Sequence, residues 1–269
     1  MKKIYFIIAA AFMMSLLVAC SNDGGNGDVD DEVVPADLTY EISEKSYEES
    51  FTSDDKEIAY YSFTFPQITP SDERGKEIAD GFNEYFESLA QEKIEEFKST
   101  VYENALASYN EIGAEQWGDK AYTQTITFGA VKCIDYIAIT FDTTTTEEES
   151  VPGFFCRMYD MKNGGVFELR DLSDTPDELV AAVAADILTQ LQEQELTESL
   201  YEDYSERVSQ MEGAEMYFSE DGLVVTFPTG TLGPKEAGMP CLLVDYPVID
   251  SYLNDFALSL LYEFTGVVG

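Results

Sequence analysis

The chain has 269 residues, 45% of them hydrophobic, which is enough length and apolar content to fold around a substantial core. Its 53 Asp and Glu against 15 Lys and Arg give a formal net charge of −38, which would repel a nucleic-acid backbone and excludes that class of partner. The chain contains no histidine, which excludes His-based acid–base catalysis, Ser-His and Cys-His nucleophile pairs, and His-containing zinc sites.

The N-terminus has the features of a bacterial lipoprotein signal. Two lysines precede an apolar run of 16 residues, Ile4 to Ala19, which is shorter than the roughly 20 residues of a membrane span. The stretch Leu17-Val18-Ala19-Cys20 resembles a lipobox, whose cysteine receives a diacylglycerol before cleavage. We expect residues 1–19 to be a signal peptide and Cys20 to be lipidated; an ordinary signal peptide with an incidental cysteine is the alternative.

Lipidation at Cys20 predicts the cellular location of the mature chain. Cleavage removes two lysines and no acid, which changes the formal net charge from −38 to −40. Acyl chains would hold the protein on the extracytoplasmic side of a bacterial membrane. Residues 20–37 are acidic and glycine-rich and predict a flexible tether. A calcium loop is less favoured because the EF-hand spacing is absent around Asp23, Asn26, Asp28 and Asp30.

Two strands and a long helix are expected next. Alternation within Leu38 to Glu49 predicts the first strand, and residues 58–65 predict a second that Pro66 ends, with a polar hairpin loop at 53–55. From about Asp72, apolar residues recur at three- and four-residue steps. This period predicts an amphipathic helix that reaches about Tyr109.

Further strands follow in the middle of the chain. Residues 123–128 and 134–141 alternate and are rich in β-branched and aromatic side chains, which predicts two strands. Residues 154–161 and 166–169 flank Lys162-Asn163-Gly164-Gly165, where Asn-Gly supplies the positive φ angles of a tight turn. A hairpin is expected there.

The C-terminal third begins with a helix signal. Thr175-Pro176-Asp177-Glu178 has the pattern of an N-cap threonine, a first-turn proline and a capping-box glutamate. The predicted apolar stripe of this helix is Leu179, Val183, Ile187 and Leu191. Helical periodicity resumes near residues 200–204. A second hairpin at 214–218 and 223–227, a strand at 242–244, and a terminal helix complete the chain; that helix carries Ile249, Leu253, Phe256 and Leu260.

Strands in hairpins and a few helices predict an α+β fold with an antiparallel β-sheet and two or three packed α-helices. The predicted organisation is a signal peptide at 1–19, a tether at 20–37, and a folded region at 38–269. That region is either one domain or two subdomains with a break near residues 110–120.

Three cysteines remain once Cys20 is lipidated. An odd number cannot all pair internally, and three are too few for a disulfide scaffold. Cys133 and Cys156 both lie in strand-like runs, so a bridge between them and a set of buried free thiols, Cys241 included, are both open. A catalytic thiol would need an activating base, and histidine is absent.

Three segments together carry a resemblance to a known family. They are Phe65-Pro66-Gln67-Ile68 running into a helix with Phe82-Asn83, Tyr159 to Gly165 leading to Leu169-Arg170-Asp171-Leu172, and Phe218 to Phe227 leading to Ala237-Gly238. Over residues 38–250 the chain resembles the extracytoplasmic family of unknown general function found in the RsiV anti-sigma factor, a lysozyme receptor, and in the N-terminal part of the peptidoglycan deacetylase PdaC.

The chain also departs from that family. Residues 143–153 stand where members often have Gly-Gly-Ala-His, so the recognition made by that loop is not carried over. Sigma-factor binding needs a cytoplasmic segment, and deacetylation needs a histidine metal site in a separate domain. Neither activity transfers to this chain.

Catalytic, cofactor and metal motifs are not found in the sequence. Among so many acids, runs such as Glu95-Glu96 and Glu147-Glu148-Glu149 do not by themselves indicate a glycosidase pair. Gly24-Gly25 and Gly164-Gly165 lack the lysine and helix entry of a phosphate loop. We therefore predict no catalytic residue, no cofactor and no metal.

Trp117 is the candidate binding residue. Together with Tyr109 and Tyr122 it could stack on a sugar or anchor a protein, or it could plug a sheet edge. The favoured hypothesis is a surface-tethered module that binds a protein, such as basic lysozyme, or cell-wall glycan. The alternative is a carboxylate-dependent cell-wall enzyme or an enzyme accessory.

Overall fold

A computed structural model describes residues 39–265, which form an α+β fold as predicted. The chain divides into Met1–Ala36 and Asp37–Gly269. The predicted signal peptide, Cys20 and nearly all of the tether belong to the first unit and lie outside the described residues. Within residues 39–265, no helix has both the length and the hydrophobicity to cross a bilayer.

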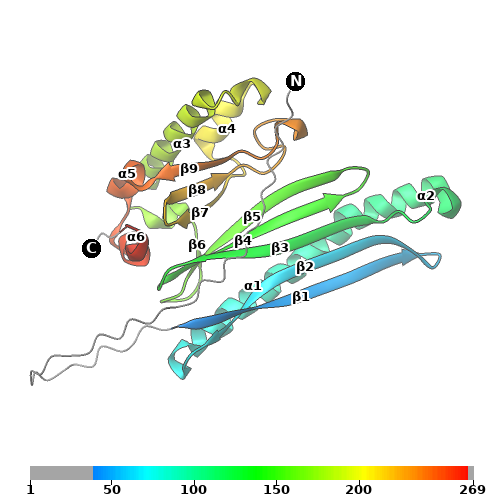
Figure 1. Cartoon of the computed structure of the whole chain (residues 1–269), viewed down its shortest axis with the longest axis horizontal. Coiled ribbons are helices and arrows are strands. Elements are labelled where there is room, and N and C mark those ends of the chain that lie inside the picture. The colour runs from blue at the N-terminus through cyan, green and yellow to red at the C-terminus, as the bar shows by residue number, and fades with distance from the viewer. Residues whose placement is uncertain (1–38, 266–269) are drawn as a thin grey trace, which may run out of the picture. The chain divides into compact units, whose positions relative to one another are not determined.

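The larger sheet has six strands in sequence order (Figure 1). They are β1 (Tyr40–Ser53), β2 (Lys56–Pro70), β3 (Tyr122–Lys132), β4 (Tyr136–Thr146), β5 (Ser150–Asp160) and β6 (Val166–Phe167). Every neighbouring pair is antiparallel except β2 and β3, which are parallel. Parallel neighbours need a long crossover, and the chain supplies one as the helices between β2 and β3.

Strand β2 runs through Pro66, where the sequence predicts its end, and continues to Pro70. The pairing with β3 covers only Ala59 to Phe63. Pro66 therefore lies beyond the part of β2 that has a neighbour on both sides, where a missing N–H interrupts no bond to β3. Pro66 is therefore tolerated within β2 and does not end the strand.

A helical segment covers one face of the larger sheet (Figure 1). It comprises a 3₁₀ turn (Glu73–Gly75), α1 (Lys76–Phe97), a π-helical turn (Lys98–Tyr102) and α2 (Glu103–Trp117). The helical backbone breaks at Gly113 (φ 79°, ψ 162°), so the uninterrupted stretch ends close to the predicted Tyr109. We call the core beneath this segment core 1. Its largest side chains include Phe63, Phe82, Phe86, Phe97 and Phe141, all at most 1% exposed.

The second sheet is smaller and has its own helices. It contains β7 (Glu215–Ser219), β8 (Gly222–Thr226) and β9 (Cys241–Asp245), all antiparallel. The helices are α3 (Pro176–Glu193), α4 (Tyr204–Gln210), α5 (Tyr246–Ile249), α6 (Asp255–Leu260) and α7 (Tyr262–Thr265), with 3₁₀ turns at Leu169–Leu172, Thr197–Ser199, Lys235–Ala237 and Asp250–Tyr252. We call the core between them core 2.

The helix α3 confirms the predicted start and stripe. Pro176 is its first residue, and Leu179, Val183, Ile187 and Leu191 are fully buried. Thr175 is the N-cap, although its side chain makes no capping hydrogen bond. The predicted terminal helix is instead broken into short pieces, because the Asn254 side chain accepts from the Ala257 N–H and starts α6 anew.

Strand β4 joins the two cores. Its side chains alternate, so that Ile137, Ile139 and Phe141 enter core 1 while Tyr136 and Ala138 enter core 2. The predicted break near residues 110–120 does not separate the cores, because this stretch spans the end of α2 and Trp117 belongs to core 1.

Candidate functional site

The three predicted binding aromatics do come together, but inside core 1. Trp117, Tyr109 and Tyr122 are 2%, 3% and 7% exposed. The Trp117 ring centroid lies 5.8 Å from that of Tyr109 and 5.4 Å from that of Tyr122. The indole N–H donates to the Lys120 carbonyl at 2.6 Å. The cluster packs the end of α2 against β3, an interior strand of the sheet. The three rings are therefore buried and do not form an open platform, and they do not lie at a sheet edge.

Of the two alternatives left open for Cys133 and Cys156, a bridge and free thiols, the structure shows free thiols, and all three described cysteines are free. Cys156 on β5 lies opposite Thr140 on β4, which lies opposite Gly129 on β3, four residues before Cys133. Neighbouring strands are about 4.8 Å apart, so two strand spacings plus this offset exceed the reach of a disulfide. Burial raises the pKa of the Cys133 thiol to about 12 and also raises that of Cys156, so neither is an activated nucleophile.

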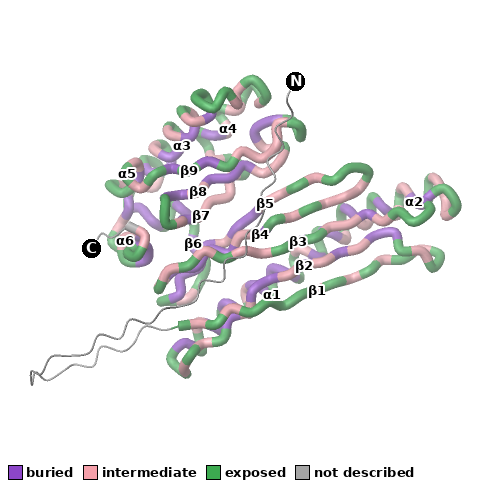
Figure 2. Tube along the Cα trace, viewed as in Figure 1, coloured by how far each residue is buried: buried purple, intermediate pink, exposed green. Residues whose placement is uncertain are grey.

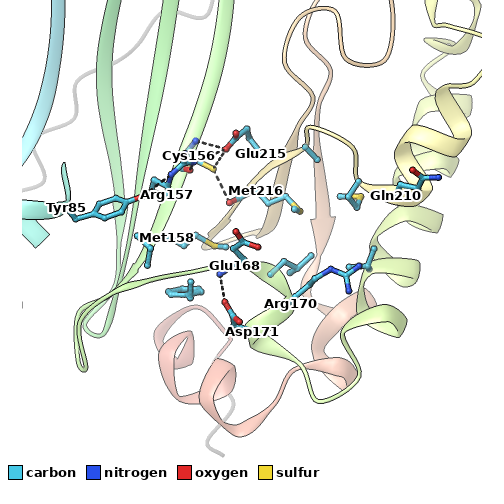
Figure 3. A pocket seen from close by; sticks show the side chains of 16 residues that line it. Tyr85, Cys156, Arg157, Met158, Glu168, Arg170, Asp171, Gln210, Glu215 and Met216 are labelled. Atoms are coloured by element: carbon cyan, nitrogen blue, oxygen red, sulfur yellow. Dashed lines mark hydrogen bonds and ion pairs between the residues drawn. The ribbon is translucent and has the colours of Figure 1, made fainter. Parts of the chain in front are cut away.

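A cavity of about 720 Å³ lies where β5 and β6 meet the second sheet (Figure 3). Three methionines, Met158, Met211 and Met216, contribute flexible apolar walls. Its polar and charged lining consists of Tyr85, Arg157, Glu168, Arg170, Asp171, Gln210 and Glu215. The cavity therefore combines adaptable apolar surface with charges of both signs.

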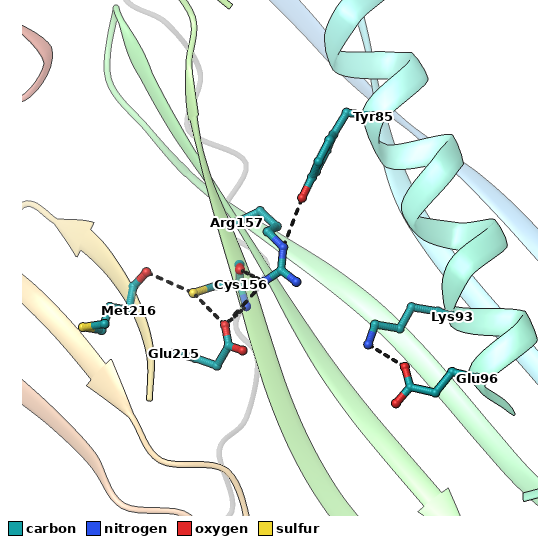
Figure 4. Close-up of polar contacts among 7 residues, drawn as sticks. All are labelled: Tyr85, Lys93, Glu96, Cys156, Arg157, Glu215 and Met216. Atoms are coloured by element: carbon teal, nitrogen blue, oxygen red, sulfur yellow. Dashed lines mark hydrogen bonds and ion pairs between the residues drawn. The ribbon is translucent and has the colours of Figure 1, made fainter. Parts of the chain in front are cut away.

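Arg157 and Glu215 form the polar centre of this cavity (Figure 4). The Arg157 Nε donates to the Tyr85 hydroxyl on α1 at 3.1 Å, and its Nη1 lies 3.6 Å from the Glu215 carboxylate on β7. The same carboxylate accepts the Cys156 backbone N–H at 2.9 Å. Arg157 thus links the helical layer to the second sheet around the edge of β5.

Burial raises the pKa of the Glu215 carboxyl, and the Cys156 N–H and the Arg157 guanidinium oppose part of that effect. A glycosidase needs a second carboxylate at a defined separation. Asp142, whose pKa burial also raises, does not line this cavity. Glu168 and Asp171 instead cap a 3₁₀ turn reciprocally, so the cavity does not present two carboxyl groups free for acid–base work.

Sequence reasoning missed both Arg157 and Glu215. Arg157 follows the apolar run Phe154-Phe155-Cys156 inside a strand, and a charge at such a position was the available signal. Glu215 gave no such signal, because nothing in the sequence distinguishes it from the other acids among the 53 Asp and Glu residues. Within the described part of the chain, no group of three or more His, Cys, Asp or Glu side chains is placed to hold a metal ion.

The segment 143–153 forms the ends of β4 and β5 and their turn. A second, more open hollow of about 740 Å³ lies beside this turn and is lined by Glu147, Glu148 and Glu149. Lys235 pairs with Glu149 at 2.8 Å, and the Asn104 amide donates to Glu147 at 3.2 Å. The hairpin thus lengthens the sheet at the place where members of the resembled family carry their recognition loop.

Comparisons with known proteins show similarity of fold. No family model and no curated protein matches the chain. A crystal structure of a DUF3298 family member from Bacteroides fragilis NCTC 9343 is similar, with a TM-score of 0.60 and 14% identity over 86% of this chain and 98% of that one. A DUF3298 family protein from Pseudomonas aeruginosa PAO1 has a TM-score of 0.43 and 12% identity over 81% and 94% of the respective chains. The chain shares the fold of the Bacteroides protein.

Proposed function

We propose that this protein is a lipoprotein, anchored through Cys20 on the extracytoplasmic side of a bacterial membrane, that binds a basic protein such as lysozyme. Cell-wall glycan is the other ligand class that such an anchor would place within reach. The lipobox-like stretch Leu17-Val18-Ala19-Cys20 and the acidic, glycine-rich residues 20–37 support the anchoring. The resemblance to the RsiV and PdaC extracytoplasmic family supports binding rather than catalysis.

The observation that carries the proposal is the charge of the folded region. Within residues 39–265, ten ion pairs engage nine basic side chains with acids. Most acidic side chains are not part of these pairs, because acids outnumber bases 53 to 15 in the chain. A surface of this kind attracts a cationic partner and steers its approach.

Calorimetry with lysozyme tests the proposal. The mature chain carrying Cys20→Ser, which prevents lipidation, is titrated with lysozyme at low and at physiological salt. Saturable one-to-one binding that survives physiological salt supports the proposal, because non-specific attraction between exposed charges is screened there. A second basic protein of similar size serves as the control. Binding that vanishes with salt, or that is equal for both proteins, contradicts the lysozyme proposal, and glycan fragments are then titrated.

A further inference from the structure

Strand β1 forms an open edge of the larger sheet. It is 14 residues long and pairs only with β2, and within residues 39–265 no strand lies on its outer side. Most of its residues are exposed (Figure 2). A long open edge is an unusual feature, since proteins commonly shorten or cover their edge strands.

The backbone groups that face outward along β1 can be identified. The Asn83 side chain donates to the Ile68 carbonyl at 2.9 Å and accepts the Ile68 N–H at 2.8 Å, so both groups of Ile68 point away from β1. Ile68 pairs with Ile42. In an antiparallel ladder such a pair is non-hydrogen-bonded, and the backbone groups of Ile42 therefore face the outer edge.

The alternation extends this assignment along the strand. The register between β1 and β2 shows no shift before Phe51 and Thr52, and the flanking Ser71 N–H donates to the Thr39 carbonyl at 2.9 Å, as the alternation requires. Pro66, which has no N–H, lies opposite Glu44 in one of the non-hydrogen-bonded pairs. The outward-facing residues are Ile42, Glu44, Ser46, Glu48 and Ser50.

The side chains at this edge select a partner by charge. Glu44, Ser46 and Glu48 are exposed, and none of them is in an ion pair in the described region. The one basic residue of the strand, Lys45, is engaged by Glu87 at 2.7 Å. A second copy pairing antiparallel about Ser46 would place Glu44 opposite Glu48, and like charges directly opposite destabilise a sheet. A strand with basic residues at those positions is stabilised instead.

We propose that the outer edge of β1 binds an extended basic segment of a partner protein by strand addition. Main-chain hydrogen bonds to Glu44, Ser46 and Glu48 would supply affinity, and cross-strand pairs with the two glutamates would supply specificity. The inference deepens the proposed function, on which it rests, by naming the surface and the form of the ligand: lysines or arginines four residues apart in a β-strand.

The test uses a synthetic peptide of about ten residues with two lysines four apart and threonine or valine between them. Its affinity is measured by calorimetry at physiological salt for the mature chain with Cys20→Ser and for its variants. Glu44→Gln with Glu48→Gln is expected to weaken binding about five- to tenfold through two lost cross-strand pairs. The matched control, Glu84→Gln with Glu92→Gln on the exposed surface of α1, removes the same charge and is expected to leave affinity unchanged.

A second variant tests the main-chain bonds. Ser46→Pro removes an outward N–H that the ladder with β2 does not use, and we expect at least a tenfold loss of affinity with the fold retained. Ser46→Ala is its control. A peptide of the same sequence and charge, N-methylated at alternate residues, tests the same bonds without altering the protein and is expected not to bind.

The outcomes separate this inference from the proposed function. Equal affinity for the parent, the double glutamine variant and Ser46→Pro, or equal binding of the N-methylated peptide, overturns strand addition. If lysozyme binds at physiological salt and Ser46→Pro leaves that binding unchanged, the proposed function stands and the β1 inference fails. If the peptide binds with the expected losses and lysozyme does not, the edge inference stands and lysozyme is excluded as the partner.

Discussion

The two edges of the six-stranded sheet differ in how their backbone is satisfied. At the β5 edge, Glu215 accepts the Cys156 N–H at 2.9 Å and the Thr229 hydroxyl donates to the Pro152 carbonyl at 2.8 Å. Strand β6 pairs with the end of the same strand. At the β1 edge, no strand in the described region pairs with the outward groups of Glu44, Ser46 and Glu48.

This difference shows that the two edges of one sheet can have different roles, one in packing and one in binding. The covered edge holds the second sheet in place, with Arg157 reaching from β5 to both Tyr85 and Glu215. The β1 edge is not paired with another strand of the described region, and it carries acidic side chains. Acidic side chains prevent pairing with a like strand and leave pairing with a basic one available. Stability and binding are thereby assigned to different edges.

The largest effect is expected from the aromatic cluster, which lies at neither edge. Trp117→Ala removes a large buried side chain and should lower the free energy of unfolding by about 3–5 kcal/mol. Denaturant unfolding measures this loss. Because the ring is buried, peptide affinity of the remaining folded protein should be unchanged; a selective loss of affinity at retained stability would place binding at the cluster and not at β1.

A smaller loss is expected where the second sheet meets β4. The Tyr136 hydroxyl donates to the Phe218 carbonyl at 3.2 Å and accepts the Phe218 N–H at 2.9 Å, and Tyr136 is fully buried. Tyr136→Phe leaves both backbone groups without this partner and should cost about 1–3 kcal/mol. Thermal unfolding checks the value. A neutral substitution would show that this contact does not hold the second sheet.

The alternation along β1 predicts a difference between neighbouring prolines. Lys45→Pro removes an N–H that bonds to β2, whereas Ser46→Pro removes one that faces outward. Unfolding in urea should show Lys45→Pro to be less stable than Ser46→Pro by about 1 kcal/mol, the net value of a hydrogen bond. Lys45→Ala corrects for the ion pair with Glu87. The reverse order would mean that the outward assignment is wrong.

The smallest effect concerns the pH dependence of the covered edge. Because burial raises the folded pKa of Glu215 above its ordinary value, the folded state binds this proton more tightly than the unfolded state. The stability from protonated Glu215 is present at low pH and is lost as pH rises through the raised pKa. Glu215→Gln should therefore gain stability relative to the parent at pH of about 7 and show no such gain at about 4. An equal difference at both values would contradict the buried setting of the carboxyl.

Local signals predicted the elements that depend on neighbouring residues. The hairpin around Lys162 to Gly165 is confirmed, with Asp160 accepting the Lys162 and Asn163 N–H groups. Its positive φ angles fall on Gly164 (81°) and Gly165 (109°), not on Asn163 and Gly164 as predicted. Non-local contacts decided the rest. The parallel pairing of β2 with β3 depends on where the helices lead the chain, and Glu215 reaches its position only when β7 packs beside β5.

The most direct test of the open edge is amide hydrogen exchange of the free protein, resolved by residue along β1. The amides of Glu44, Ser46 and Glu48 should exchange rapidly, while those of Lys45 and Tyr47 should be protected by the ladder with β2. Addition of the basic peptide should protect the first set selectively. Equal protection of both sets in the free protein would contradict the account, because the outer edge of β1 would already be paired.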